Sequence, residues 1–228
     1  MSLSGTSLLH LLQLSSPSLP VGAYSYSQGL EAAMASGVVR DEASARAWIV
    51  SMLDDVVSRF EAPVFWRLMR AFADKDAGAV QYWTEYFLAS RDSAEFRAET
   101  VQMGYSLGKL LAELRKDDAA VLALLQRLPE VPFPTALAAA AVSLQVPAGE
   151  ALLGLLFSWA ENQVLACVKS VPLGQVAGQR MLLSLRPQLE QAARKAAQLS
   201  DDELSNWSPG LSVLSMQHEV QYSRLYRS

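Results

Sequence analysis

The chain has 228 residues, of which 51% are hydrophobic and 18% are charged, and its formal net charge is −4. This length and apolar fraction predict one domain with a sizeable core and exclude a chain that is disordered throughout. The basic residues are scattered rather than clustered on one segment, which argues against a nucleic-acid-binding protein.

Thiol and imidazole side chains are scarce. Cys167 is the one cysteine, so an internal disulfide is excluded, and the first residues lack the basic segment of a signal peptide. We therefore expect a cytoplasmic protein. The two histidines, His10 and His218, and Cys167 have none of the spacings of a metal motif, so one subunit is not expected to build a metal site alone. Two copies of His218 that meet across a dimer remain a hypothesis for a metal site.

Helical periodicity dominates the chain from its first third. Asp41 is a predicted N-cap for a helix that reaches about residue 60, and Pro63 fits the first turn of a new helix. A further helix is expected over about residues 77–90, because its apolar side chains recur at helical spacing.

A long helix is predicted after Asp92, which forms a capping arrangement with Glu95. Gly104 and Gly108 lie four residues apart in this helix. Because glycine is unfavourable inside a helix, this pair predicts a close approach by another helix.

A short helix is expected over residues 119–128, followed by three prolines that predict a corner between two halves of the chain. Beyond the corner, Glu150 and Glu161 are the only charged residues as far as residue 168. We expect two helices here, over about 135–145 and 149–169, that are apolar on nearly all sides and lie at the centre of a bundle or at an oligomer interface.

A membrane span is the competing interpretation of this apolar stretch. Pro147 and Glu150 on one side and Glu161 on the other leave about ten uninterrupted apolar residues, and a span needs about 20. We therefore expect no membrane-spanning segment.

Two more helices are predicted over residues 174–186 and 188–199, with a short acidic one after Ser200, and the Ser-Pro-Gly at 208–210 is expected to stop the pattern. No segment alternates long enough to predict a strand. The fold class is therefore all-α, a single-domain bundle of about nine to eleven helices over residues 1–228 with a proline-broken corner in mid-chain.

Residues 15–31 form the first segment that a core does not explain. Two prolines and Gly22 predict a fixed loop, with Ser25 or Ser27 as the cap of a helix that begins at Gln28. Either the loop is a rigid entry to the bundle on which its tyrosines pack, or Tyr24, Tyr26 and Glu31 form a surface for a partner.

Lys169 marks the second segment, where Pro172 and Gly174 end one helix and start another. A lysine near a helix C-terminus is favoured by the helix dipole and extends to water. A catalytic lysine would need a lowered pKa and a reacting partner, and the sequence shows neither.

The third segment is the C-terminus, which is richer in aromatic, arginine and apolar residues than a frayed end. If it is helical, His218 and Tyr222 share a face. The segment is either docked on the bundle or becomes ordered when a partner binds. No Ser-His-Asp set can be identified, so an interaction protein is favoured over an enzyme.

These segments carry a family resemblance. Residues 18–31 resemble the N-terminal signature of the urease accessory protein F family, residues 169–175 its central motif, and residues 218–228 its C-terminal signature. Residues 91–104 fit a fourth block of the family, and the order and spacing match over nearly the whole chain.

The resemblance implies an all-helical homodimer that is not an enzyme. It implies a scaffold that bridges the D/H accessory protein and the GTPase accessory protein G and promotes GTP-dependent nickel insertion into apo-urease. No cofactor is expected to stay bound, since nickel only passes through the complex and the partner GTPase binds GTP. The alternative function is a GTPase-activating or fidelity regulator of the G protein that acts in trans, although no arginine is marked for that role.

The resemblance also implies site residues. It implies that Glu31 and Lys169 have regulatory roles. It implies that the tail, residues 211–228, contacts the partners. Within the tail, Tyr226 occupies a position at which phenylalanine is commoner in the family. Deletion of the last 15 residues is expected to abolish GTPase recruitment and to leave the fold largely intact. The complete predicted partner-binding set is Tyr24, Tyr26, Glu31, Lys169, His218, Glu219, Tyr222, Arg224, Leu225, Tyr226 and Arg227.

Overall fold

The computed structural model describes residues 3–171 and 173–228, and in those residues it contains helices and no strand, which confirms the all-α prediction. Met1, Ser2 and Pro172 lie outside the described residues, and so does the helix break that is expected at Pro172. The helices are α1 (Gly5–Leu14), α2 (Leu30–Ala35), α3 (Glu42–Met52), α4 (Ala62–Ala73), α5 (Ala77–Ala89), α6 (Ala94–Leu114), α7 (Ala119–Gln126), α8 (Phe133–Ser143), α9 (Ala148–Ser170), α10 (Gln175–Ser184), α11 (Arg186–Gln198) and α12 (Pro209–Glu219). Two 3₁₀ turns, η1 (Ala23–Ser25) and η3 (Asp201–Glu203), and a π-helical segment, η2 (Leu53–Glu61), complete the list.

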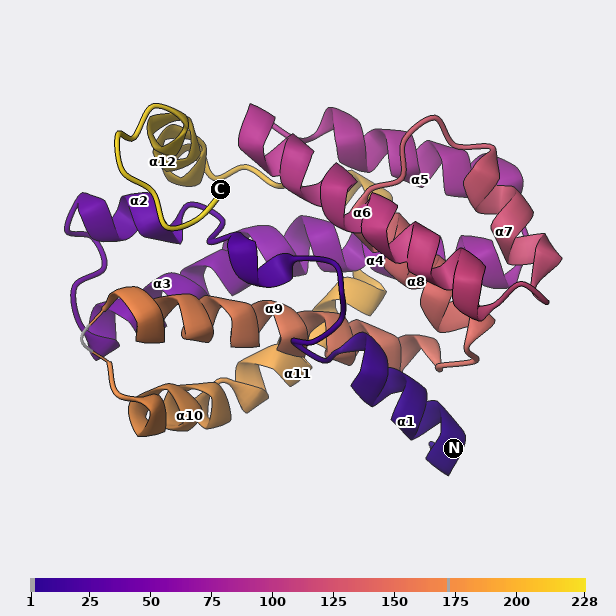
Figure 1. The fold of residues 1–228 in the computed structure, drawn as a ribbon, viewed down its shortest axis with the longest axis horizontal. Coiled ribbons are helices and arrows are strands. Elements are labelled where there is room, and N and C mark those ends of the chain that lie inside the picture. The colour runs from indigo at the N-terminus through magenta and orange to yellow at the C-terminus, as the bar shows by residue number, and fades with distance from the viewer. Residues whose placement is uncertain (1–2, 172) are drawn as a thin grey trace.

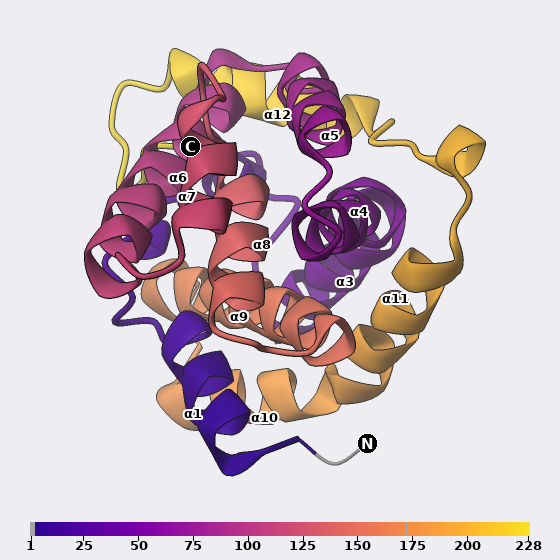
Figure 2. The same cartoon turned by 90° about the vertical axis from the view of Figure 1, so that its right-hand side faces the viewer.

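The centre of the bundle is formed by α4, α8 and α9 (Figures 1 and 2). In Figure 1, α9 runs between α3 and α4 on one side and α10 and α11 on the other. In α8, a run of small residues at 138–141 is almost completely buried, so α4 and α6 can both pack closely against it. The prediction of helices at the centre of the bundle after the proline corner is confirmed for α8 and α9.

Among the described residues, α9 is the one helix that has the length and apolar composition to cross a membrane. In this structure it packs against α4, α10 and α11. Just under half of its most apolar stretch, 44%, is buried inside the bundle.

Pro63 lies in the first turn of α4, as predicted. No break separates α4 from the preceding helix, however, because α3, η2 and α4 form one continuous helical rod. A proline inside a helix removes one hydrogen bond and its ring clashes with the preceding turn. Here the wider π-helical turn comes directly before it, and the amide of Ala62 bonds to the carbonyl of Val57, five residues back. The wide turn therefore makes room for the proline ring without ending the helix.

Asp41 is confirmed as an N-cap, since its carboxylate accepts the Ser44 amide at 2.8 Å. The cap predicted at Asp92 is wrong by one residue. Ser93 caps α6 by accepting the Phe96 amide at 3.1 Å, and this leaves Glu95 free to bind elsewhere.

The stop predicted at residues 208–210 is also wrong, because Pro209 opens α12. A proline is tolerated in the first helical turn, where its missing N–H would have no helical partner. Near the N-terminus, α2 begins at Leu30 rather than Gln28, and Gly29 precedes it with a positive φ of 80°. Helix α1 was not expected from the sequence, and it has no fully buried residue and projects from the bundle (Figure 1).

Gly104 gives the first testable prediction. An added Cβ at this position would lie 2.0 Å from the carbonyl oxygen of Val131, so the close approach is by the backbone that enters α8 and not by another helix. Gly104→Ala is expected to destabilise the protein by about 1–3 kcal/mol through overpacking, as measured by urea unfolding.

Gly108 is the matched control, because nothing lies within 4 Å of an added Cβ. Gly108→Ala is expected to stabilise the protein by up to about 1 kcal/mol, the helix preference of alanine over glycine. Equal effects of the two substitutions would contradict the packing role of Gly104.

Candidate functional site

The first and third of the unexplained segments lie against each other. After α12 the chain turns back across α2 and ends beside the loop that precedes α2 (Figure 1). From here on, the C-terminal tail means residues 220–228, the part of the predicted segment 211–228 that follows α12. Its backbone is bonded to this loop twice, since the Arg227 amide donates to the Ser25 carbonyl at 2.8 Å and the Ser27 amide donates to the Ser228 carbonyl at 2.8 Å.

Glu31 on α2 is the anchor of the tail. Its carboxylate accepts the backbone amides of Leu225 at 2.7 Å and Tyr226 at 2.9 Å, and it lies 3.0 Å from Nε2 of His218. The side chain is buried, so these groups replace water around it. A single carboxylate thereby ties the tail to α12.

His218 on α12 is completely buried and its ring is held on both sides. Besides the Glu31 contact, Nδ1 lies 2.7 Å from Oε2 of Glu95 on α6. The other oxygen of Glu95 accepts from the guanidinium of Arg224 at 2.6 Å. Three elements that are far apart in the sequence therefore converge on one imidazole.

This arrangement bears on the metal hypothesis for His218. Both ring nitrogens are engaged inside the chain, so a metal ion could reach them only after the tail and α12 move. In residues 3–171 and 173–228 no group of three or more His, Cys, Asp or Glu side chains is placed to hold a metal ion.

Glu99, one helical turn beyond Glu95, forms a second anchor. It accepts from the Ser228 hydroxyl and from Nε2 of Gln28, both at 2.6 Å. Burial raises the pKa of Glu99 to about 7, although both of these hydrogen bonds favour the charged form. Gln28 has a positive φ of 55°. Its side-chain amide oxygen, Oε1, accepts a hydrogen bond from Nε1 of Trp159 at 2.8 Å, so the network continues into α9.

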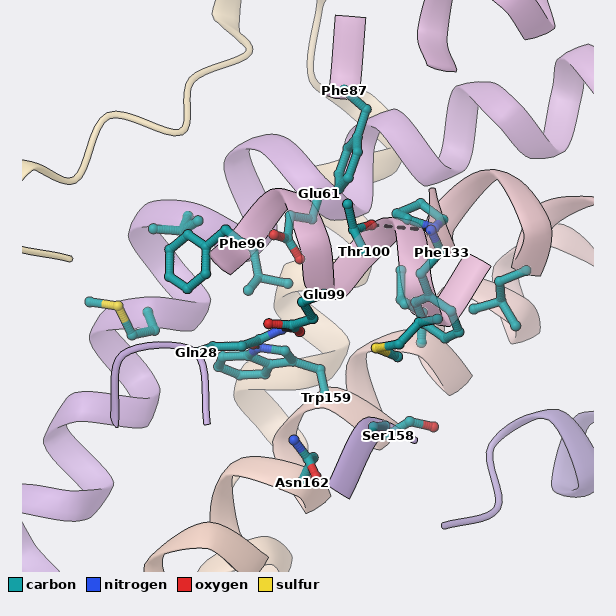
Figure 3. Close-up of a pocket in the computed structure, with 18 of the residues that line it drawn as sticks. Gln28, Glu61, Phe87, Phe96, Glu99, Thr100, Phe133, Ser158, Trp159 and Asn162 are labelled. Carbon is teal, nitrogen blue, oxygen red and sulfur yellow. Dashed lines mark hydrogen bonds between the residues drawn. The ribbon is translucent and has the colours of Figure 1, made fainter. Parts of the chain in front are cut away.

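A cavity of about 150 Å³ adjoins this network (Figure 3). Figure 3 shows Glu99 beside Gln28 and Trp159 at this cavity. Its other polar lining includes Glu61, whose carboxylate pairs with Arg91 at 2.7 Å. The aromatic lining is contributed by Phe87, Phe96, Phe133 and Trp159. Glu99 therefore lines the cavity and also binds the end of the tail.

Lys169 lies at the C-terminal end of α9 with its side chain exposed. Its ammonium is 5.8 Å from the ring centroid of Tyr226, within range of a cation–π interaction. The tail, which belongs to the third segment, thus contacts the first and the second segments as well.

The structure divides the predicted set into two groups. The buried members are Tyr26, Glu31, His218 and Tyr226, which lie where the tail packs against the bundle. The exposed members are Tyr24, Lys169, Glu219, Tyr222, Arg224, Leu225 and Arg227. The prediction that His218 and Tyr222 share a helix face is wrong, because α12 ends at Glu219 and the chain then turns. The carboxylate of Glu219 instead accepts the amide of Ala94 at the start of α6.

Sequence reasoning missed Glu99, Gln28 and Trp159 and gave Glu95 only a capping role. A signal was present, because Glu95 and Glu99 are four residues apart and must share one face of a helix. Two acidic side chains on one face of a helix indicate that hydrogen-bond donors lie nearby.

Comparison with known proteins identifies the family of the chain. The family model for UreF matches residues 39–186. The chain belongs to the UreF family. It is 73% identical over 221 residues to the urease accessory protein UreF of Janthinobacterium sp. (strain Marseille), with 97% of this chain and 98% of the relative covered. It is 62% identical over 221 residues to the UreF of Nitrosospira multiformis, with 97% of each chain covered.

The relatives extend beyond the matched family model. The UreF of Azoarcus sp. is 52% identical over 225 residues, with 97% of this chain and 95% of the relative covered. The family model leaves out both residues 18–31 and the tail, whereas these full-length alignments span nearly the whole chain. The resemblance to the UreF family is therefore confirmed.

Glu31→Ala tests the anchor. The substitution leaves three buried donors without an acceptor, and breaking a buried charged contact in this way typically costs about 3–5 kcal/mol. We expect hydrogen exchange at the amides of Leu225 and Tyr226 to lose its protection, as measured by mass spectrometry. Glu190→Ala on the exposed face of α11 is the control, and unchanged exchange in Glu31→Ala would refute the anchoring role.

Glu99 predicts a pH dependence of stability. Because its pKa rises from the ordinary 4.5 to about 7 in the folded protein, its contribution is fully present below pH 4.5 and is lost as the pH rises through 7. The difference amounts to about 3 kcal/mol. Glu99→Gln is therefore expected to unfold at a higher temperature than the unmodified protein at pH 8 and to show a flatter profile between pH 4.5 and 8.

Glu113→Gln, on the exposed end of α6, is the matched control and is expected to follow the unmodified profile. A Glu99→Gln protein that is less stable than the unmodified protein at pH 8 would contradict the predicted cost of ionising Glu99.

Proposed function

We propose that this UreF family member acts in urease maturation as a scaffold without catalytic activity. In this proposal it bridges the D/H accessory protein and the GTPase accessory protein G and promotes GTP-dependent nickel insertion into apo-urease. Nickel passes through the complex, the G protein carries GTP, and this chain retains no cofactor. The relatives are named urease accessory proteins, which supports a role in urease maturation. The assignment of the partners rests on the family resemblance.

The observation that carries the proposal is a rigidly held tail with outward-facing apolar side chains. Tyr222 is fully exposed, and Val220 and Leu225 are exposed by 84% and 75%. Val213 and Met216 of α12, the helix that precedes the tail, are also more than half exposed. Exposed apolar groups of this kind mark interaction sites, and a segment already held by buried hydrogen bonds loses little further freedom on binding.

The proposal includes a homodimer in the cytoplasm. The exposed leucines of α1, Leu8, Leu9 and Leu12, are available for contact with a second copy. Cys167 is a buried free thiol whose pKa is raised to about 12 by burial, which suits a protein that uses no thiol chemistry.

Reconstituted urease activation tests the function as a whole. Apo-urease, the D/H and G proteins, nickel, bicarbonate and GTP are combined with and without this chain, and ammonia release is followed. We expect activation to require this chain. Equal activation in its absence, with the added protein shown to be folded, would overturn the proposal.

The double variant Tyr222→Ala, Leu225→Ser tests the tail surface. Both side chains point to solvent, so the fold and melting temperature are expected to stay unchanged. Affinity for the G protein, measured by titration calorimetry in the presence of the D/H protein, is expected to fall about thirtyfold or more, as for interface hot spots.

Tyr105→Ala on α6 is the matched control, since Tyr105 is also more than half exposed but lies outside the tail and α12. Undiminished binding of both partners by the double variant would place the partner surface elsewhere.

A further inference from the structure

We propose that His218 holds the tail in place as a doubly protonated imidazolium, so that loss of one ring proton releases the tail. This inference concerns the tail itself. Its consequence for partner binding rests on the function proposed above.

The hydrogen-bond count requires the charged ring. An ionised carboxylate only accepts hydrogen bonds, and a neutral imidazole has one donor nitrogen and one acceptor nitrogen. Both ring nitrogens of His218 face carboxylate oxygens, at 2.7 Å and 3.0 Å. A neutral ring would therefore place a lone pair against a carboxylate on one of its two sides.

Neither carboxylate is free to take up the missing proton. Glu31 already accepts two backbone amides besides the ring, and Glu95 already accepts from Arg224. A proton on either acid would weaken bonds that its charged form makes well. The proton that completes the cluster therefore belongs on the imidazole.

The charges of the cluster balance only in this state. The two carboxylates, Glu31 and Glu95, are matched by the imidazolium of His218 and the guanidinium of Arg224. His218 is completely buried, and the carboxylate side chains on either side of it are only 10% and 12% exposed. Removal of one proton leaves a net negative charge there, and a buried, uncompensated charge is costly.

Other titratable groups surround the cluster. Those on the elements packed around it are Glu99 of α6, Cys167 and Lys169 of α9, Glu219 of α12, Tyr26 of the loop, and Tyr226 and Arg227 of the tail. Burial raises the pKa of Tyr26, Tyr226 and Cys167 further above neutrality, so these three stay protonated near pH 7. Glu99, with its pKa of about 7, is the group whose titration must be separated from that of His218.

Linkage gives the direction of the effect. Because both ring nitrogens of His218 face carboxylate oxygens in the docked arrangement, that arrangement requires the second ring proton, and a rise in pH lowers the ratio of docked to released tail. The tail is therefore held at lower pH and released at higher pH.

The ring protons can be observed directly, because His10 and His218 are the only histidines. Nitrogen-15 NMR of the side chains in the full chain is expected to show both nitrogens of His218 protonated at neutral pH. His10 is the internal reference, since within residues 3–171 and 173–228 only its Nδ1 is hydrogen-bonded, to the carbonyl of Leu144 at 2.8 Å. A His218 ring with a single proton while the tail is docked would overturn the proposal.

Release of the tail is measured with a fluorophore on Ser223→Cys, an exposed position, since Cys167 is buried and unreactive. Its anisotropy is expected to fall as the pH rises from 6 to 9, and to do so in a Glu99→Gln background as well. His218→Gln, which offers one amide donor group and one acceptor, is expected to give a mobile tail at every pH. His10→Gln is the matched control and is expected to keep the transition.

The two proposals fail differently. An anisotropy that stays high and constant from pH 6 to 9 overturns the inference about His218, whatever the partners do. If the tail is released with rising pH but affinity for the G and D/H proteins is unchanged, the role of the tail in partner binding fails and the His218 inference stands.

Discussion

The docked tail depends on one physical constraint, which is that a buried carboxylate must be surrounded by donors. Glu31 lies in the interior and meets this requirement with two amides from the tail and the ring of His218. If the tail leaves, the charge of Glu31 remains buried without compensation unless water enters. The end of the chain is therefore held by the donors that the buried Glu31 carboxylate requires, in addition to the burial of Tyr226 in the core.

The helical bundle makes this constraint effective because it holds the acids in fixed positions. The close approach at Gly104 packs α6 against the backbone entering α8, and α6 in turn presents Glu95 and Glu99 on one face. Gln28 and Trp159 continue the same network into α9. The position of the tail is thereby linked to the central helix and to the adjoining cavity.

The same arrangement reconciles two interpretations of the C-terminus that the sequence left open. A docked terminus and a partner-binding segment look like alternatives, yet the tail buries Tyr226 and Ser228 while it exposes Tyr222 and Leu225. Some side chains of the tail thus pack against the bundle, while others face the solvent. In the proposed function, the docked position of the tail determines the surface to which a partner binds.

The sequence by itself determined the helical class, most helix positions and the choice of Glu31, Lys169 and His218, because periodicity, caps and short motifs are local. It did not determine that Glu31 and His218 touch, since 187 residues separate them and only the packing of α2, α6 and α12 brings them together. It placed Pro63 in the first turn of a helix, but it did not predict the π-helical turn that joins this helix to the preceding one. Contacts between distant segments, and the protonation that those contacts impose on a buried ring, depend on the whole fold, and no local pattern records them.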